Sequence, residues 1–385
     1  MRIVYCVNFL WNIGGVEHVT IVKANALAQI AGNEVWIVVV NDSHPPMRKI
    51  DERVHVVSLG ITDYKRYWEM NRLQANWRLW KKRKFHKEKL EDTLNLILPD
   101  VVISTHNMEM YFLPFIKCVS NPIFIKEIHY TSNWRLLLAT TLYTKFMAYI
   151  WNIIEYKISG SRYDIIVLLT NEDKERSWKG NDKVVVIPNP LTIQHNKRSA
   201  LRNKTVITVG RLVGQKNFSS LIRTWDIVHQ SHPDWHLEIW GEGKLKAGLQ
   251  QQIKDKHLEG SIFLKGYTND IIETFPNASI YVCSSHFEGL PLVLIEAMSC
   301  GLPIVSYACP CGPRDIISEG NDGFLILVGD EQGMADRINY LIEHETIRQQ
   351  MGMAALEKSK QYATDIIIRK WMLLFHHELK NHRRI

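Results

Sequence analysis

Short runs rich in valine and isoleucine alternate with longer amphipathic segments along nearly the whole chain, and this alternation limits the possible folds most strongly. In the first half the runs are Arg2–Val7, Glu34–Val40, Val101–Ser104, Ile123–Glu127 and Ile165–Leu169. Such runs are typical of buried strands in a parallel sheet. Helical patterns of ten or more residues separate most of them, so the chain is predicted to form βαβ units and a doubly wound α/β fold.

A proline-rich interruption divides the chain. Ile187–Pro190 carries two prolines within three residues and is followed by a polar stretch through Lys204, which together indicate a linker. The alternation then restarts at Val206–Val209, His236–Ile239, Ser261–Leu264, Ile280–Val282, Pro303–Ser306 and Phe324–Leu327. We therefore expect two Rossmann-like domains, 1–188 and 189–363, facing each other across a ligand cleft, and a C-terminal helix in 364–385 that crosses back to the first domain.

Composition excludes several classes of protein. Hydrophobic residues make up 46% and charged residues 23%, which is ordinary for a soluble enzyme. No uncharged apolar stretch of membrane-spanning length is present, and Ile3–Trp11 fits a buried first strand better than a signal peptide. The six cysteines lack a Cys-x-x-Cys spacing and indicate free thiols in a reducing cytoplasm. Since no Asp-x-Asp pair is present, we predict that the protein uses no metal and no cofactor.

The strongest motif is HFEGLPLVLIE at His286–Glu296. A predicted strand leads into a turn and then a helix, whose first backbone N–H groups have no partner within the helix and form an anion site. Glu288 lies at the turn and Glu296 eight residues later in the helix, so the two carboxylates can accept hydrogen bonds from sugar and ribose hydroxyls at different depths along one bound molecule. A capped helix with solvated acids is the alternative, but the Gly-Leu-Pro turn favours ligand binding. The predicted ligand contacts are Glu288, Gly289, Leu290, Pro291, Leu292 and Glu296.

A second motif follows the first strand of the second half. The strand ends at Gly210, Arg211 and Lys216 flank Gly214, and a helix begins near Asn217. An arginine fork and a mobile lysine charge can together neutralise a diphosphate leaving group. Two surface cations on a loop are the alternative, which the glutamate motif in the same half makes less attractive.

Two weaker features lie in the first half. Gly14 and Gly15 form a glycine turn that opens a helix, without the full spacing of a Rossmann phosphate loop. His129 lies just past the carboxyl end of a predicted strand, where a side chain faces the ligand crevice of such a sheet. A lone histidine is more often structural, so this assignment needs other support.

Taken in order, these motifs resemble one family over nearly the whole chain. The set Gly14-Gly15, His129, Pro188–Pro190, Gly210-Arg211, Lys216-Asn217, Gly266-Tyr267, Glu288 and Glu296 resembles the retaining glycosyltransferases of the large GT-B family 4. The second half matches strongly, including Ala297–Pro303 and Cys311–Asp315, whereas the first half matches loosely. These are enzymes of bacterial polysaccharide and glycolipid assembly.

The resemblance implies a role for each motif. Arg211 and Lys216 would bind the donor phosphates. Glu296 would take the ribose hydroxyls, and Glu288 with the Gly289–Leu292 backbone would hold the transferred sugar. The catalytic residues implied are Glu288, His129, Arg211 and Lys216.

The remaining positions complete the implied donor site. Gly266 and Tyr267 would lie near the base, Gly15 near the diphosphate and His129 near the reacting sugar. The resemblance also implies retention of configuration, with the leaving phosphate helping to deprotonate the acceptor hydroxyl.

Positive charge is concentrated in one segment that the family pattern does not explain. Residues 1–190 carry 25 Lys and Arg against 19 Asp and Glu, whereas residues 191–385 carry 22 against 21. Ten cations with interleaved aromatic residues lie in 64–89, and Leu73, Trp77 and Trp80 share a helical face. An anionic membrane surface, a solvated helix packed on its own domain, and nucleic acid are three interpretations. The apolar stretch Trp134–Trp151 is either core or part of the same docking face.

These observations predict a retaining hexosyltransferase that moves a sugar from a nucleotide-diphosphate sugar, with UDP favoured, to a glycan or lipid-linked acceptor. We expect it in the cytoplasm, peripheral on the inner face of the membrane, without a nucleic-acid partner because the cations lie in one helix-length insert. A sugar-nucleotide epimerase of related fold is an alternative that the paired glutamates disfavour. A non-catalytic nucleotide-sugar-binding or scaffold protein is another, but such a protein would have lost Arg211, Lys216 or Glu288.

Overall fold

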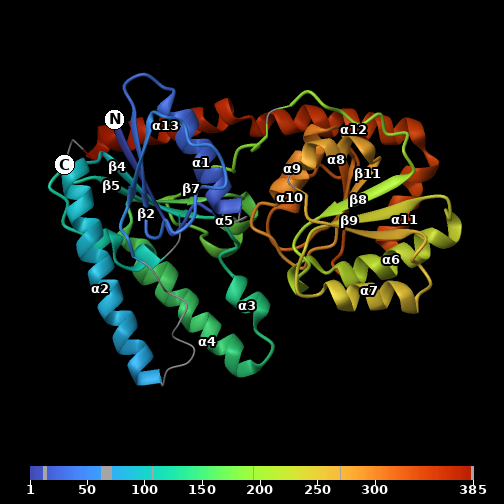
Figure 1. Ribbon diagram of the computed structural model, residues 1–385, viewed down its shortest axis with the longest axis horizontal. Coiled ribbons are helices and arrows are strands. Elements are labelled where there is room, and N and C mark those ends of the chain that lie inside the picture. Colours follow the sequence, from blue (N-terminus) through green and yellow to red (C-terminus); the bar gives the residue numbers. More distant parts are fainter. Residues whose placement is uncertain (12–14, 62–71, 106–107, 194, 269, 383–385) are drawn as a thin grey trace. The chain divides into compact units, whose positions relative to one another are not determined.

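The computed structural model describes residues 1–11, 15–61, 72–105, 108–193, 195–268 and 270–382 (Figure 1). Its chain forms two compact units. The first unit contains Met1–Leu169, Lys174–Pro190 and Thr364–Ile385, and the second contains Thr170–Asp173 and Leu191–Ala363. Within the described ranges, every helix is too short or too polar to cross a membrane.

A seven-stranded sheet with strand order β3-β2-β1-β4-β5-β6-β7 forms the centre of the first unit, and every neighbouring pair is parallel. Its strands are β1 (Arg2–Val7), β2 (Glu34–Val39), β3 (Val54–Ser58), β4 (Val101–Ser104), β5 (Ile123–Ile128), β6 (Ile165–Leu168) and β7 (Val184–Val186). The five predicted runs are all strands. The two that the sequence did not reveal are the edge strands, one largely exposed and the other three residues long.

Helices cover both faces of this sheet, and alternate residues of β1 therefore pack into two different cores. Ile3, Tyr5 and Val7 pack with α1 and α13, whereas Val4 and Cys6 pack with α2. Helix α13 comes last in the sequence but lies beside α1 (Figure 1). The helical elements are α1 (Gly15–Ala28), α2 (Arg72–Ile97), η2 (Met108–Tyr111), η3 (Leu113–Phe115), α3 (Trp134–Leu138), α4 (Leu142–Ile153), the π-helical η4 (Ile154–Ser159), η5 (Gly160–Arg162), α5 (Asn171–Ser177) and α13 (Thr364–His382).

The second unit repeats the doubly wound pattern with a six-stranded sheet of order β10-β9-β8-β11-β12-β13, again parallel throughout. All six predicted runs are strands. They are β8 (Thr205–Val209), β9 (His236–Trp240), β10 (Ile262–Gly266), β11 (Ile280–Cys283), β12 (Ile304–Tyr307) and β13 (Gly323–Ile326). The doubly wound α/β prediction is therefore confirmed in both units.

Helices again pack on both faces of the second sheet. A large apolar core joins it to α6, α7 and α11, with Trp225 fully buried. The helical elements are η6 (Gly214–Lys216), α6 (Phe218–Ser231), α7 (Lys246–Asp255), α8 (Ile271–Thr274), η7 (Phe275–Asn277), α9 (Leu292–Ser299), α10 (Pro313–Ile316), α11 (Glu331–Glu343), α12 (Glu345–Ser359) and η8 (Lys360–Tyr362).

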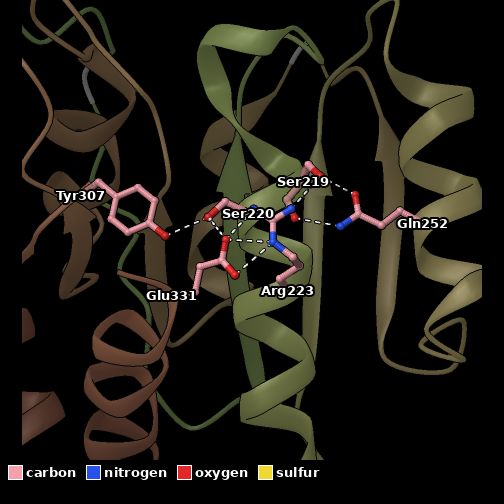
Figure 2. Close-up of polar contacts among 6 residues, drawn as sticks. All are labelled: Ser219, Ser220, Arg223, Gln252, Tyr307 and Glu331. Atoms are coloured by element: carbon pink, nitrogen blue, oxygen red, sulfur yellow. Dashed lines mark hydrogen bonds and ion pairs between the residues drawn. The ribbon is translucent and has the colours of Figure 1, made fainter. Parts of the chain in front are cut away.

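A polar network fixes the first turns of α6 (Figure 2). The Arg223 Nε donates to Glu331 at 2.9 Å, and the Ser220 hydroxyl donates to the same carboxylate at 2.8 Å. Ser220 in turn accepts from the Tyr307 hydroxyl, 2.9 Å away. Burial acts to raise the pKa of Glu331, but the hydrogen bonds from Arg223 and Ser220 outweigh it and lower that pKa below its usual range. The network thus joins α6 to β12 and α11 through a charged carboxylate.

We predict that Glu331→Gln lowers the free energy of unfolding by about 1 kcal/mol at neutral pH, because Arg223 loses its anionic partner and the hydrogen bond from Ser220 becomes a neutral one. A lowered folded-state pKa stabilises the protein above the usual glutamate pKa, and that contribution disappears as the pH falls through the folded value. Urea titrations should therefore show the difference between wild type and variant shrinking below about pH 4.5. The exposed pair of Glu357 and Lys360 supplies a matched control, and Glu357→Gln should change stability by less than about 0.5 kcal/mol. An equal loss in both variants would contradict the prediction.

Candidate active site

Two loops at the carboxyl edge of the second sheet carry the strongest motifs, and backbone bonds hold them together. One loop runs from the end of β8 to α6, and the other from the end of β11 to α9. The His286 N–H donates to the Gln215 carbonyl at 2.8 Å, and the Ser284 hydroxyl donates to the Lys216 carbonyl at 2.8 Å. Gln215 Nε2 also donates to the Phe287 carbonyl at 2.9 Å. The β8 loop and the β11 loop therefore form one structure.

A buried ion pair lies where these loops meet. Lys216 Nζ is 2.6 Å from Glu288 Oε1, and the Ser285 hydroxyl donates to the same oxygen at 2.6 Å. Burial acts to lower the pKa of Lys216, but attraction to Glu288 and their hydrogen bond outweigh it, so that pKa lies above the usual lysine value. Lys216 is therefore a cation at neutral pH. The predicted pair of Arg211 and Lys216 separates here, since Arg211 is exposed on the loop whereas Lys216 lies inside it.

Close backbone contacts set the path of the β8 loop. The Gly210 N–H donates to the Trp240 carbonyl, and the Gly241 N–H donates to the Gly266 carbonyl. The ends of β8, β9 and β10 consequently lie in register. A Cβ on Gly241 would lie 1.9 Å from the Gly210 carbonyl oxygen, so only glycine fits there. The next residue after Gly266, Tyr267, is 49% exposed at the same edge of the sheet.

Helix α9 begins beside the ion pair. Pro291 is its N-cap residue with φ −71°, and the helix runs from Leu292 to Ser299. The Glu288 N–H donates to the Pro310 carbonyl at 2.9 Å, which anchors the turn. The first N–H groups of a helix make a favourable site for an anion. The cation of Lys216 and the beginning of α9 are thus held by the same turn.

The second glutamate of the motif lies deeper in α9. Glu296 is 7% exposed, and its Oε1 accepts a hydrogen bond of 2.7 Å from the Thr192 hydroxyl. Thr192 lies in the polar stretch after the proline pair, and no sequence motif includes it. The two glutamates therefore have separate partners, Lys216 for one and Thr192 for the other.

Gly312, which follows Cys311 after β12, is required there for a steric reason. Gly312 has φ +100°, and a Cβ there would lie 2.4 Å from Pro291 Cδ and 3.0 Å from the Gly289 carbonyl oxygen. The segment after β12 therefore presses against the turn that begins α9. Ser285, Gln215 and Gly312 support the site although the sequence motifs did not single them out.

The first unit holds the weaker candidates. Helix α1 begins at Gly15, which is exposed, while Gly14 lies outside the described residues. The side chain of His129 is 2% exposed, with Nε2 3.5 Å from Glu127 Oε1. Glu127 also pairs with the buried Lys23. Because His129 as a whole is half-buried, its accessible atoms belong to the main chain.

The basic segment is helical where the structure describes it. Residues 62–71 lie outside the described part, and α2 continues from Arg72. Trp77 and Trp80 are both more than half exposed, and Lys81 Nζ lies 3.8 Å from the centre of the Trp77 ring. The carboxyl-terminal half of α2 instead buries Leu90 and Leu94 in the sheet core. Among the described residues, no group of three or more His, Cys, Asp or Glu side chains is arranged to hold a metal ion.

Comparisons with known proteins agree with this architecture. The family model described as glycosyl transferases group 1 matches residues 192–358. An uncharacterized glycosyltransferase from Haemophilus influenzae is 30% identical over 373 residues, covering 94% of this chain and 97% of the relative. The amylovoran biosynthesis glycosyltransferase AmsD from Erwinia amylovora is 33% identical over 215 residues, covering 54% of this chain and 60% of the relative.

A solved structure shows the same fold. The crystal structure of a TarM variant from S. aureus, in complex with Fondaparinux, alpha-GlcNAc-glycerol and UDP, superposes with a TM-score of 0.76 at 17% identity. That match covers 97% of this chain and 99% of the other. The protein therefore has the GT-B fold, as its sequence predicted.

We predict that Gly312→Ala lowers the free energy of unfolding by about 2 kcal/mol or more, because its Cβ would overlap Pro291 and its φ is unfavourable for alanine. Gly320→Ala is the matched control: its φ is +76°, but nothing lies within 4 Å of the added Cβ. This variant has the unfavourable φ of alanine but no steric overlap, so its free energy of unfolding should fall by about 1 kcal/mol. Urea unfolding of both variants provides the comparison. Equal losses would show that the contact with the turn contributes nothing.

Proposed function

This chain belongs to the glycosyl transferases of group 1 and is a glycosyltransferase, and we propose that its second unit holds a nucleotide-diphosphate sugar. The observation that carries the proposal is the charged Lys216, held against Glu288 at the beginning of α9. A half-buried cation that one carboxylate holds in place is already positioned when an anion arrives.

Transfer of the sugar creates charge at two places. The bond between the anomeric carbon and the donor oxygen breaks, and its electron pair passes to the departing diphosphate. Arg211, Lys216 and the first N–H groups of α9 are suited to stabilise that negative charge. The acceptor hydroxyl bonds to the anomeric carbon and gives its proton to the departing phosphate. Such a reaction on one face of the sugar retains the configuration, which we propose for this enzyme.

Other residues near the carboxyl edge of the second sheet would bind the rest of the donor. Glu296, deep in α9, would accept from ribose hydroxyls, and the exposed ring of Tyr267 would lie near the base. Glu288, with the backbone of Gly289–Leu292, would hold the transferred hexose. UDP is the favoured nucleotide, supported by its presence in the TarM variant of the same fold.

The first unit would contribute to the reacting sugar and the acceptor. Gly15 and His129 are the residues proposed here, His129 through its accessible main chain. The acceptor is proposed to be a glycan or a lipid-linked precursor of a bacterial polysaccharide or glycolipid, in keeping with the name of the amylovoran relative. We further propose that the enzyme acts at the inner face of the membrane, which the cations of α2 would approach.

We predict that Arg211→Ala and Lys216→Ala each lower kcat by about a hundredfold or more, because each removes a charge that stabilises the leaving diphosphate. Transfer or hydrolysis of UDP-, GDP- and ADP-sugars is the assay, and it also identifies the donor. Lys204→Ala removes an exposed lysine from the same unit and should leave kcat unchanged. Near-native rates in both site variants would refute the assignment of the donor site.

We also predict full activity in excess EDTA, because the cations of the protein neutralise the diphosphate without a divalent metal. The same preparation is assayed with and without chelator, and a metal-dependent transferase run in parallel shows that the chelator is effective. Complete loss of activity that Mg²⁺ or Mn²⁺ restores would contradict this prediction.

A further inference from the structure

Helix α4 presents an apolar surface that no other described part of its own unit covers. Leu142 is 87% exposed, Tyr143 72% and Phe146 61%. Figure 1 shows α2, α3 and α4 extending away from the sheet of the first unit in the same direction. We define the α4 face by its exposed apolar residues and their neighbour on α3: Leu138, Leu142, Tyr143, Phe146 and Tyr149.

The opposite side of α4 is firmly attached, so its exposure is a property of the folded unit. Ala148 and Asn152 are buried, and Asn152 Nδ2 donates to Asn133 Oδ1 at 3.1 Å. Thr141 begins the helix with a capping box. Just beyond its end, the buried Glu155 pairs with Arg135 of α3. The helix therefore has one anchored side and one apolar side turned outward.

The exposed charge that the structure describes around the α4 face is mainly positive, because the acid just beyond α4, Glu155, is buried against Arg135. From residue 128 to residue 154 the chain contains no Asp or Glu, and Arg135 and Lys145 are its only Lys or Arg. In α2, residues 77–87 contain six Lys and Arg and again no acid. The two segments meet at Tyr111, because Arg83 of α2 lies 5.6 Å from its ring centre and Arg135 hydrogen-bonds with it.

We propose that the α4 face inserts into the headgroup boundary of an anionic lipid membrane, with the cations of α2 drawing the first unit toward it. Exposed apolar and aromatic side chains together with cations match the chemistry of such a surface. A second copy of the chain fits less well, since pairing this surface with itself would bring like charges together. The 12 residues of α4 are too few to span a bilayer, so the helix lies along the surface.

This inference rests on the proposed membrane location and names the element that produces it. The α2 cations supply attraction that salt screens, whereas the α4 face supplies apolar burial that salt does not weaken. The two contributions are therefore separable by experiment.

Sedimentation with phosphatidylcholine vesicles, with or without phosphatidylglycerol, tests the proposal. The variant Leu142→Asp with Phe146→Asp should bind anionic vesicles at least about tenfold more weakly than wild type, at low and at high salt. Leu373→Asp, on the exposed side of α13, is the matched control and should bind like wild type. A variant with Lys81, Lys82, Arg83 and Lys84 changed to Gln should lose binding mainly at low salt.

Two further measurements make each outcome decisive. An environment-sensitive fluorophore on Phe146→Cys should shift to shorter wavelength with anionic vesicles, whereas the same label on Leu373→Cys should not. Donor hydrolysis by the α4 variant should match wild type, because these residues lie outside the donor loops.

Equal binding by wild type and the α4 variant would overturn the insertion of α4 and leave the membrane location standing. No binding by wild type would overturn both. A change from dimer to monomer in the α4 variant, without vesicle binding by wild type, would show that the face pairs with a second copy. If wild type hydrolyses no nucleotide-sugar donor, that result counts against the proposed sugar transfer, independently of the vesicle binding.

Discussion

The pairing of Lys216 with Glu288 is the constraint on which the candidate site depends. Taking either charge out of water alone would be costly, so the two must be buried together. That requirement brings the loop after β8 against the loop after β11, where His286 and Ser284 then bond to the other loop's backbone. A buried ion pair contributes little net stability compared with apolar packing. The ion pair instead fixes the position of the Lys216 ammonium group beside the beginning of α9.

In the proposed donor complex, this ion pair would couple the binding of two parts of the donor. When a diphosphate approaches, Lys216 can share its charge with the phosphate oxygens, which weakens its hold on Glu288. The carboxylate is then available to accept from hydroxyls of the transferred sugar, while Ser285 keeps it in position. Phosphate binding and sugar binding would thus reinforce each other through one ion pair. Glu296, whose partner is Thr192, stands outside this exchange and suits a part of the donor that does not change during transfer.

Sequence periodicity was sufficient for the fold because eleven strands are short, apolar and separated by helices. It missed β3 and β7, whose lengths or exposed residues give no such signal. Within the site, Arg211, Lys216 and Glu288 could be found because each belongs to a local motif. Thr192, Gln215 and Pro310 could not, because they meet the motifs through contacts between residues far apart in sequence. The role of Gly312 depends on a backbone approach that no pattern of residue types reveals.

The stretch Trp134–Trp151 shows a different limit of sequence analysis. An apolar helix has the same composition whether it fills a core or lies on a membrane, and only its packing distinguishes the two. Ala148 and Asn152 face the unit while Leu142 and Phe146 face outward, so the helix is not core. Soluble monomeric proteins rarely expose a large continuous apolar surface to water. An apolar face kept on a helix whose other side is bonded to its unit is what the proposed insertion would require, and the six cations at 77–87 of α2 favour a negatively charged surface over a neutral one.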